Sequence, residues 1–135
     1  MIGIEIKYDI KFEGSYVRNK EEIKEILQNL KDCGVMDFML LSRDGTPLAY
    51  SIQNDRAHAD TVATMAATLC GAADAANSEL RKETPIYTRS DSEDAETLVM
   101  RAGDRHVMLV SGKQGLEKKI NNILEIAQKA VSKLD

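Results

Sequence analysis

The chain has few of the residues that ligand pockets and catalytic centres usually need. Among its 135 residues there is no tryptophan, aromatic residues make up 4%, and histidine and cysteine occur twice each. A pocket for a large flat ligand normally has an aromatic lining, so this shortage argues against one. No apolar run approaches the ~20 residues that a membrane-spanning helix requires. The composition therefore directs attention to the protein's surfaces.

The cysteines and histidines belong to no recognisable metal-binding or catalytic motif. Cys33 and Cys70 lie far apart on segments with helical patterning, and neither belongs to a Cys-x-x-Cys pair. We expect both to be reduced, buried packing residues and to form neither a disulfide nor a metal site. His58 precedes a long helix and His106 begins an apolar run, without a neighbour that would position either as a general base. The sequence predicts no catalytic residue, no metal site and no cofactor.

Charge of both signs is plentiful and well mixed along the chain. The 18 basic and 22 acidic residues leave a net charge of −4, which argues against a nucleic acid or an anionic membrane as the main partner. Charged residues alternate with apolar ones from Glu5 to Lys11, so no apolar signal-peptide core opens the chain. We expect a cytoplasmic protein that does not insert into membranes.

The N-terminal residues show the two-residue period of a half-buried strand. Six apolar or aromatic residues occupy one face of this predicted strand, namely Ile2, Ile4, Ile6, Tyr8, Ile10 and Phe12. Turn-forming residues follow at 13–16. We therefore divide the chain into a strand-like extension, residues 1–16, and one domain, residues 17–135.

The sequence predicts an amphipathic helix soon after the N-terminal strand and another at the end of the chain. The first is predicted over residues 20–33, because Asn19 and Glu22 form a capping-box pattern and Gly34 is a C-cap glycine. The last is predicted from Leu116 to Leu134, with apolar residues at helical spacing and charged residues between them. Both helices have one face suited to covering a sheet.

Five short apolar runs predict the strands. Two flank an Asp-Gly turn at 44–45, a strong hairpin signal, and three follow the long helix as a meander whose first strand contains Pro85 and is predicted at a sheet edge. The runs are residues 35–41, 48–52, 84–89, 95–101 and 105–111. The acidic loop at 90–96 is interpreted as solvated. The Gly-rich segment at 111–115 is interpreted as a strand-to-helix connection, because it lacks the spacing of a phosphate-binding loop.

A long helix is predicted over residues 55–80, and residues 61–73 within it carry no charge. On a helical projection one face gathers larger apolar residues and is expected on the sheet. These residues are Val62, Ala66, Leu69, Ala73, Ala76 and Leu80, flanked by Met65 and Cys70. The opposite face carries small neutral residues, which would let another helix approach closely. These residues are Thr64, Ala67, Thr68, Gly71, Ala75 and Ser78.

A second copy of the chain is the simplest cover for that small neutral face. The two other helices are needed on the far side of the sheet, and a two-fold dimer places a patch against itself. Burial within the same chain is the alternative. The strand and helix order predicts an α+β fold with a mainly antiparallel sheet.

The hairpin LLSRDGTPLAYS, the helix ADTVATMAATLCGAADAANSEL, the meander and the closing helix resemble the roadblock/LC7 (dynein light chain-related) family over residues 19–134. This resemblance implies a five-stranded antiparallel sheet with one central helix on one face and two terminal helices on the other. Residues 1–14 lie outside the resemblance, and they could add a sixth strand at the free edge of the sheet. The resemblance also implies a homodimer through the central helix and the first meander strand. The contact residues would be Thr64, Ala67, Thr68, Gly71, Ala75, Ile86 and Thr88.

The function implied by the resemblance is that of a non-enzymatic adaptor that binds and regulates or scaffolds a small Ras-like GTPase. Three alternatives stay open at this point. They are a small-molecule sensor module, a structural or motor-complex subunit without a GTPase link, and an enzyme. The last would need a cluster of perturbed carboxylate or histidine groups.

Overall fold

The computed structural model describes residues 7–14 and 17–134. Its α-helices and strands are β1 (Lys11–Phe12), α1 (Lys20–Gln28), β2 (Val35–Ser42), β3 (Pro47–Ser51), α2 (Ala59–Glu79), β4 (Tyr87–Asp91), β5 (Glu96–Arg101), β6 (His106–Gly112) and α3 (Ile120–Ser132). Two 3₁₀ helices, η1 (Asn29–Cys33) and η2 (Leu116–Lys119), follow α1 and precede α3. Within this described part of the chain, no helix is long and apolar enough to cross a membrane.

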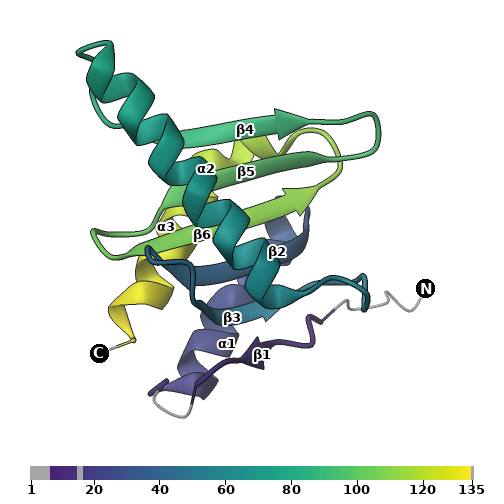
Figure 1. The fold of residues 1–135 in the computed structure, drawn as a ribbon. Coiled ribbons are helices and arrows are strands. Elements are labelled where there is room, and N and C mark those ends of the chain that lie inside the picture. Colours follow the sequence, from purple (N-terminus) through teal and green to yellow (C-terminus); the bar gives the residue numbers. More distant parts are fainter. Residues whose placement is uncertain (1–6, 15–16, 135) are drawn as a thin grey trace.

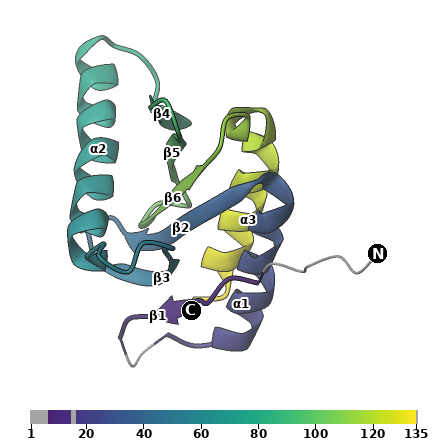
Figure 2. The same ribbon diagram turned by 90° about the vertical axis from the view of Figure 1, so that its right-hand side faces the viewer.

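The six strands form one antiparallel sheet in the order β1-β3-β2-β6-β5-β4. Helix α2 crosses one face of this sheet, and α1 and α3 cover the other (Figures 1 and 2). The predicted α+β architecture is confirmed. The N-terminal segment supplies the sixth strand, and this strand pairs with β3 at the sheet edge opposite β4.

The central strand β2 shows why the sheet needs covering on both sides. Its residues Phe38–Leu41 are all fully buried, and successive side chains of a strand point to opposite faces. Phe38 and Leu40 pack in the cluster under α1 and α3, whereas Met39 and Leu41 pack in the cluster under α2. The continuous apolar run therefore marks a strand buried on both faces.

Two of the predicted local details were wrong. Asn19 does not cap α1 with its side chain, because it has a left-handed backbone with φ 60° and donates its Nδ2 to the Lys133 carbonyl at 3.0 Å. The N-terminal strand was expected over residues 2–12, but among described residues it comprises only β1, and residues 1–6 lie outside the described part. Gly34 has the predicted left-handed conformation, with φ 85°.

Both cysteines are buried, as predicted. Cys33 ends η1 in the cluster beneath α1 and α3, and Cys70 lies on α2 in the other cluster. The sheet separates them, so each contributes to packing in a different layer.

Candidate protein-interaction surface

Helix α2 lies on the sheet through three small residues. Ala63, Ala66 and Cys70 are the buried residues of this helix, and they pack against Met39, Leu41, Val99 and Val107 of the sheet. Side chains of this size allow the helix axis to lie near the short end of the usual range of packing distances. Ala63 and Ala66 therefore allow α2 to pack closely on the sheet.

This orientation corrects the predicted sheet-facing side of the helix. Val62 and Ala73 are only half-buried, and Leu69, Ala76 and Leu80, which were expected on the sheet, are exposed. The buried face is rotated from the predicted one by a little less than one residue step of ~100°. The prediction placed the larger apolar side chains inward. The sheet instead receives the small ones, because they permit the closer approach.

The rotation leaves an exposed apolar stripe along α2. This stripe comprises Met65, Leu69, Ala72, Ala76 and Leu80, whose spacing of three or four residues puts them on one side of the helix. Met65 and Leu80 are each 67% exposed and Leu69 is 38% exposed. Among the described residues only five large hydrophobic side chains are exposed, and four of them lie in this stripe or at Ile86. Their clustering on one surface is the unusual feature, since scattered exposed apolar residues are ordinary.

The five predicted interface residues of α2 lie on the side away from the sheet or on its flank. Thr64, Thr68, Gly71 and Ala75 are exposed, and Ala67 is half-buried. The two threonine hydroxyls donate to the carbonyls of Asp60 at 2.9 Å and Thr64 at 2.8 Å, so their hydrogen bonds are satisfied within the helix. A Cβ at Gly71 would meet no atom within 4 Å. The protomer therefore leaves Thr68, Gly71 and Ala75 accessible to a partner.

The flank at Thr64 and Ala67 is partly covered by the protein's own hairpin. A Cβ added at Gly45, in the turn between β2 and β3, would lie 3.4 Å from the Thr64 Cα and 3.7 Å from the Ala67 Cβ. Gly45 has φ 91°, and this left-handed conformation favours glycine. The apolar stripe lies on the opposite flank of α2. Its exposure was not predicted, because both flanks of the helix are apolar and uncharged in the sequence.

The two predicted positions outside α2 lie beside its C-terminal half. Ile86, immediately before β4, is 68% exposed, and Thr88 lies within β4 opposite Val99 of β5. Both line a small crevice together with Cys70 and Ala73 of α2. Strand β4 ends the sheet and is paired only with β5 among the described strands. The structure thus places the open sheet edge next to the exposed surface of α2.

Asp74 fastens this part of α2 to the sheet. Its carboxylate pairs with the Arg101 guanidinium on β5 and lies 3.7 Å from the Arg43 guanidinium in the hairpin turn. The Asp74 side chain is mostly buried, so the pair is shielded from water more than a surface salt bridge is. No sequence pattern singled out this residue. Its partners come from two separate parts of the sheet and could be found only in the folded chain.

The Gly-rich segment before α3 does hold an anion, and the anion is the protein's own carboxylate. Glu96 accepts hydrogen bonds from the backbone N–H groups of Gly115 at 2.9 Å and Glu117 at 2.8 Å. Glu96 is only 4% exposed, so its predicted position in a solvated loop was wrong. The interpretation of residues 111–115 as a strand-to-helix connection fits this arrangement, because the Gly115 N–H already binds Glu96.

The described residues contain no group of three or more side chains arranged to hold a metal ion. His58 lies exposed at the N-cap of α2 without a side-chain capping hydrogen bond, and His106 begins β6. Residues 61–73 of α2 carry no charge, and Cys70 and Ala73 line the crevice shared with Ile86 and Thr88 at the edge strand β4.

Several solved bacterial structures have this fold. MglB from Myxococcus xanthus superposes with a TM-score of 0.76 at 14% identity, covering 87% of this chain and 100% of that one. The gliding protein MglB from Thermus thermophilus gives 0.70 at 18% identity, covering 96% and 97%. A Roadblock/LC7 domain from Streptomyces avermitilis gives 0.63 at 18% identity, covering 73% and 83%. A comparison with proteins of curated function finds no match.

The fold defines a class of small α+β proteins in which one long helix covers one face of an antiparallel sheet and two further helices cover the other. The family model described as the Roadblock/LC7 domain matches residues 22–111. The chain belongs to the Roadblock/LC7 family, as its hairpin and long helix predicted.

Proposed function

We propose that the protein is a homodimeric adaptor that binds a small Ras-like GTPase and regulates or scaffolds it. The observation that carries the proposal is the apolar stripe of α2 lying beside the open edge of β4, in a surface that offers contacts rather than chemistry. Membership of the Roadblock/LC7 family and the likeness to the gliding protein MglB support a regulatory role.

The first step of the proposal is dimerisation through α2 and β4. A two-fold axis beside β4 would pair this strand with its own copy and bring the two α2 helices together above it. The contact would include the apolar stripe together with the predicted residues Ile86, Thr88, Thr68, Gly71 and Ala75. The predicted residues Thr64 and Ala67 lie toward the protein's own hairpin, so they would be at the margin of this contact. Burying the stripe removes apolar surface from water, which is the main driving force for association.

Light scattering after gel filtration tests this step. The intact protein should have about twice the mass of the 15.0 kDa chain. Leu69→Glu should yield a folded monomer, because it places a charge in the contact while Leu69 is outside the protomer's buried core. Met36→Glu is the matched control, since Met36 is 37% exposed but lies on β2, and it should remain dimeric. A monomeric intact protein, or equal behaviour of the two variants, would contradict dimerisation through this surface.

The second step is recognition of the GTPase. The dimer would offer a surface that neither protomer has alone, formed where the two α2 helices meet. The proposed role requires no catalytic group from this chain, in keeping with the regulatory and adaptor roles that its family resemblance implies. Binding to the helices is distinguishable from binding elsewhere, because only the former depends on dimerisation.

A capture experiment tests the second step. The protein is immobilised and presented with the small GTPases of its source organism, each loaded with GDP or with a GTP analogue. Nucleotide-dependent capture by the intact protein and by Met36→Glu, lost in Leu69→Glu, is the expected result. A hydrolysis assay then separates regulation from scaffolding. Binding that ignores the nucleotide would favour a structural or motor-complex subunit, and no capture of any GTPase would remove the proposal.

A further inference from the structure

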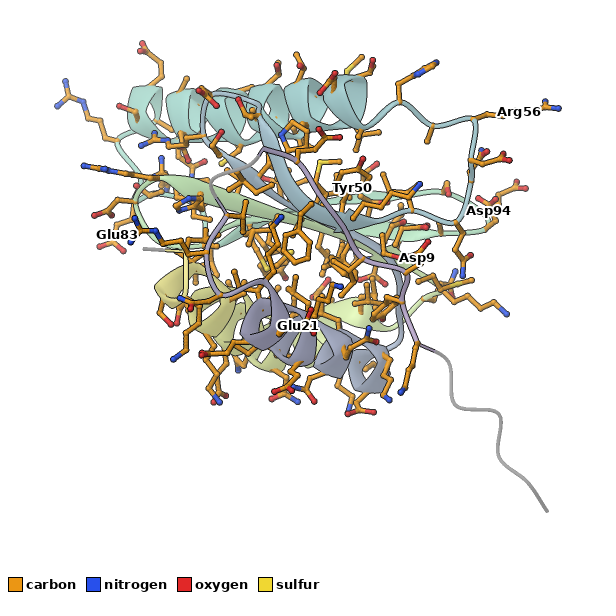
Figure 3. The ribbon with its side chains drawn as sticks, turned by 90° about the horizontal axis from the view of Figure 1, so that it is seen from below. Asp9, Glu21, Tyr50, Arg56, Glu83 and Asp94 are labelled. Carbon is orange, nitrogen blue, oxygen red and sulfur yellow. The ribbon has the colours of Figure 1, made fainter. Side chains whose placement is uncertain are left out.

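Residues 7–13 lie across the edge of β3 as an extended segment, here named the strap. Figure 3 looks toward this edge and shows the strap passing between the layer of α2 and the layer of α1, with Asp9 on it and Tyr50 of β3 nearby. Apolar and charged residues alternate along it. Tyr8, Ile10 and Phe12 pack against the core beneath α1 and α3, and the charged residues between them are exposed.

The strap is held in the manner of a bound peptide. The side-chain amide of Gln28 accepts from the Tyr8 N–H and donates to the Tyr8 carbonyl, both at 3.0 Å, as a neighbouring strand would. The Tyr8 hydroxyl donates to the Val35 carbonyl, and its ring meets Phe38 edge-on at 4.9 Å. Main-chain hydrogen bonds with alternate side chains in pockets are how sheet edges recognise extended peptides.

The strap's pairing with β3 itself is short. Only Lys11 and Phe12 form ladder pairs, opposite Tyr50 and Ala49, and the Glu13 N–H donates to the Leu48 carbonyl at 3.0 Å. Beside the earlier half of the strap lies a pocket of about 640 Å³, which is also lined by Tyr50–Asp55, Ala57 and Ala59. The strap therefore covers the edge of β3 while leaving most of its own length out of the sheet.

The covered edge of β3 is complementary to itself. Because Glu13 and Leu48 are a hydrogen-bonded pair, Lys11 and Tyr50 form the next one, and Leu48 and Tyr50 direct their backbone groups outward from β3. An antiparallel copy of β3 centred on Ala49 would place Leu48 opposite the Tyr50 of that copy. Both edge positions would then be satisfied in each copy.

We propose that the strap is a removable cap on a self-association edge, and that a second copy of β3 takes its place when the strap leaves. The two edges of the sheet would then have different roles. Among the described strands, the edge at β4 is unpaired, whereas the edge at β3 is covered by the strap of the same chain. An uncovered strand edge is a template for pairing with another chain, so the strap would limit how far the protein assembles. This inference does not depend on the dimer proposed above.

A chain that begins at Gly14 tests the cap directly. Light scattering should show concentration-dependent association that doubles the mass of a monomeric protein, or extends a dimer into a longer series because each dimer would carry two such edges. Adding Leu69→Glu to the shortened chain separates this inference from the proposed function. That variant should still double through β3, whatever happens at α2.

A synthetic peptide of residues 7–14 should reverse the association when added in excess, and a peptide carrying Tyr8→Ser, Ile10→Ser and Phe12→Ser should not. Leu48→Pro in the shortened chain removes an edge N–H at a position that tolerates proline, and it should also prevent association. Association beyond the mass of the intact protein that persists with Leu48→Pro, or a folded shortened chain no larger than the intact one, would overturn the proposal.

If circular dichroism shows that the shortened chain does not fold, Gln28→Ala in the intact chain decides the question. This change releases the Tyr8 backbone while keeping every apolar residue of the strap. The variant should associate at high protein concentration, and Leu48→Pro should suppress that association. A Gln28→Ala protein of unchanged mass at all concentrations would also overturn the proposal.

Discussion

The two faces of the sheet are packed in different ways. Of the twelve largest fully buried side chains among the described residues, ten belong to the cluster formed by the sheet with α1 and α3, and only Met39 and Leu41 belong to the cluster under α2. The first face is covered by two helices with well-buried apolar sides. The second is covered by one helix that buries small residues and keeps larger ones outside. The difference is that one face is fully covered within the protomer, whereas the helix on the other face keeps apolar side chains exposed.

The same truncation on the two faces should give the largest contrast. Leu27→Ala, on α1, should destabilise the protein by about 2–5 kcal/mol, because it leaves a cavity in a fully buried cluster. Leu69→Ala, on α2, should leave the protomer's stability within about 1 kcal/mol and weaken self-association instead. Urea unfolding at several protein concentrations measures both effects. Equal losses in the two variants would show that the faces do not differ in this way.

Enlarging a small residue under α2 should be the next largest effect. Ala66→Leu should cost about 1–3 kcal/mol, because Ala66 is enclosed between the helix and the sheet. The same change at Ala72, in the apolar stripe, is the matched control and should have little effect on the free protomer. Thermal unfolding of the two variants is the measurement. A tolerated Ala66→Leu would mean that α2 can move away from the sheet at little cost.

Removing one hydroxyl from the α1 and α3 side should have a smaller effect. Tyr8→Phe should lose about 0.5–1.5 kcal/mol at neutral pH, the net value of its hydrogen bond to Val35. Burial raises the pKa of Tyr8 well above its ordinary value of 10.0, with smaller contributions from Cys33, Asp32 and Asp37. The native state therefore keeps the phenolic proton after the unfolded chain has released it.

The Tyr8 contribution should be fully present below about pH 10 and should decline as pH rises further. The measurement compares the urea midpoints of the intact protein and Tyr8→Phe between pH 8 and pH 11, a range of ~3 pH units that includes the ordinary tyrosine pKa. The two midpoints should converge at the alkaline end. Parallel curves would contradict this assignment of the titrating group.

The smallest expected effect is a gain. Gly71→Ala should stabilise the free protomer by about 0.5–1 kcal/mol, since alanine favours a helix interior and the added Cβ meets nothing. If Gly71 lies at the closest contact of the dimer, the same change should weaken association. Comparing Gly71→Ala in the Leu69→Glu background and in the otherwise unchanged chain separates the two effects. A gain of equal size in both would place Gly71 outside the contact.

The sequence predicted most of the elements because their patterns are local. The Asp-Gly hairpin, the meander and the two amphipathic helices depend on turn residues and on periods of two or 3.6. The long helix was also predicted, but its rotation was not. Two apolar flanks of similar length compete for the sheet, and no local pattern tells which one packs closer.

The other differences between the predicted and the observed structure involve hydrogen-bond partners that are distant in the chain. Asn19 bonds to Lys133 instead of capping its own helix, and Glu96 turns inward to two N–H groups near residue 115. The predicted contact residues of α2 remain predictions. The structure adds the apolar stripe beside them, which the expected sheet-facing side had hidden.

By itself, the sequence determined the α+β class, the strand order along the chain, the family and the neutral character of α2, because these depend on composition and spacing. Only the tertiary structure decided which flank of α2 meets the sheet, which edge the N-terminal strap closes and which groups hold Glu96. Those outcomes depend on how closely elements far apart in the chain can approach, and on which backbone groups remain unpaired when they do.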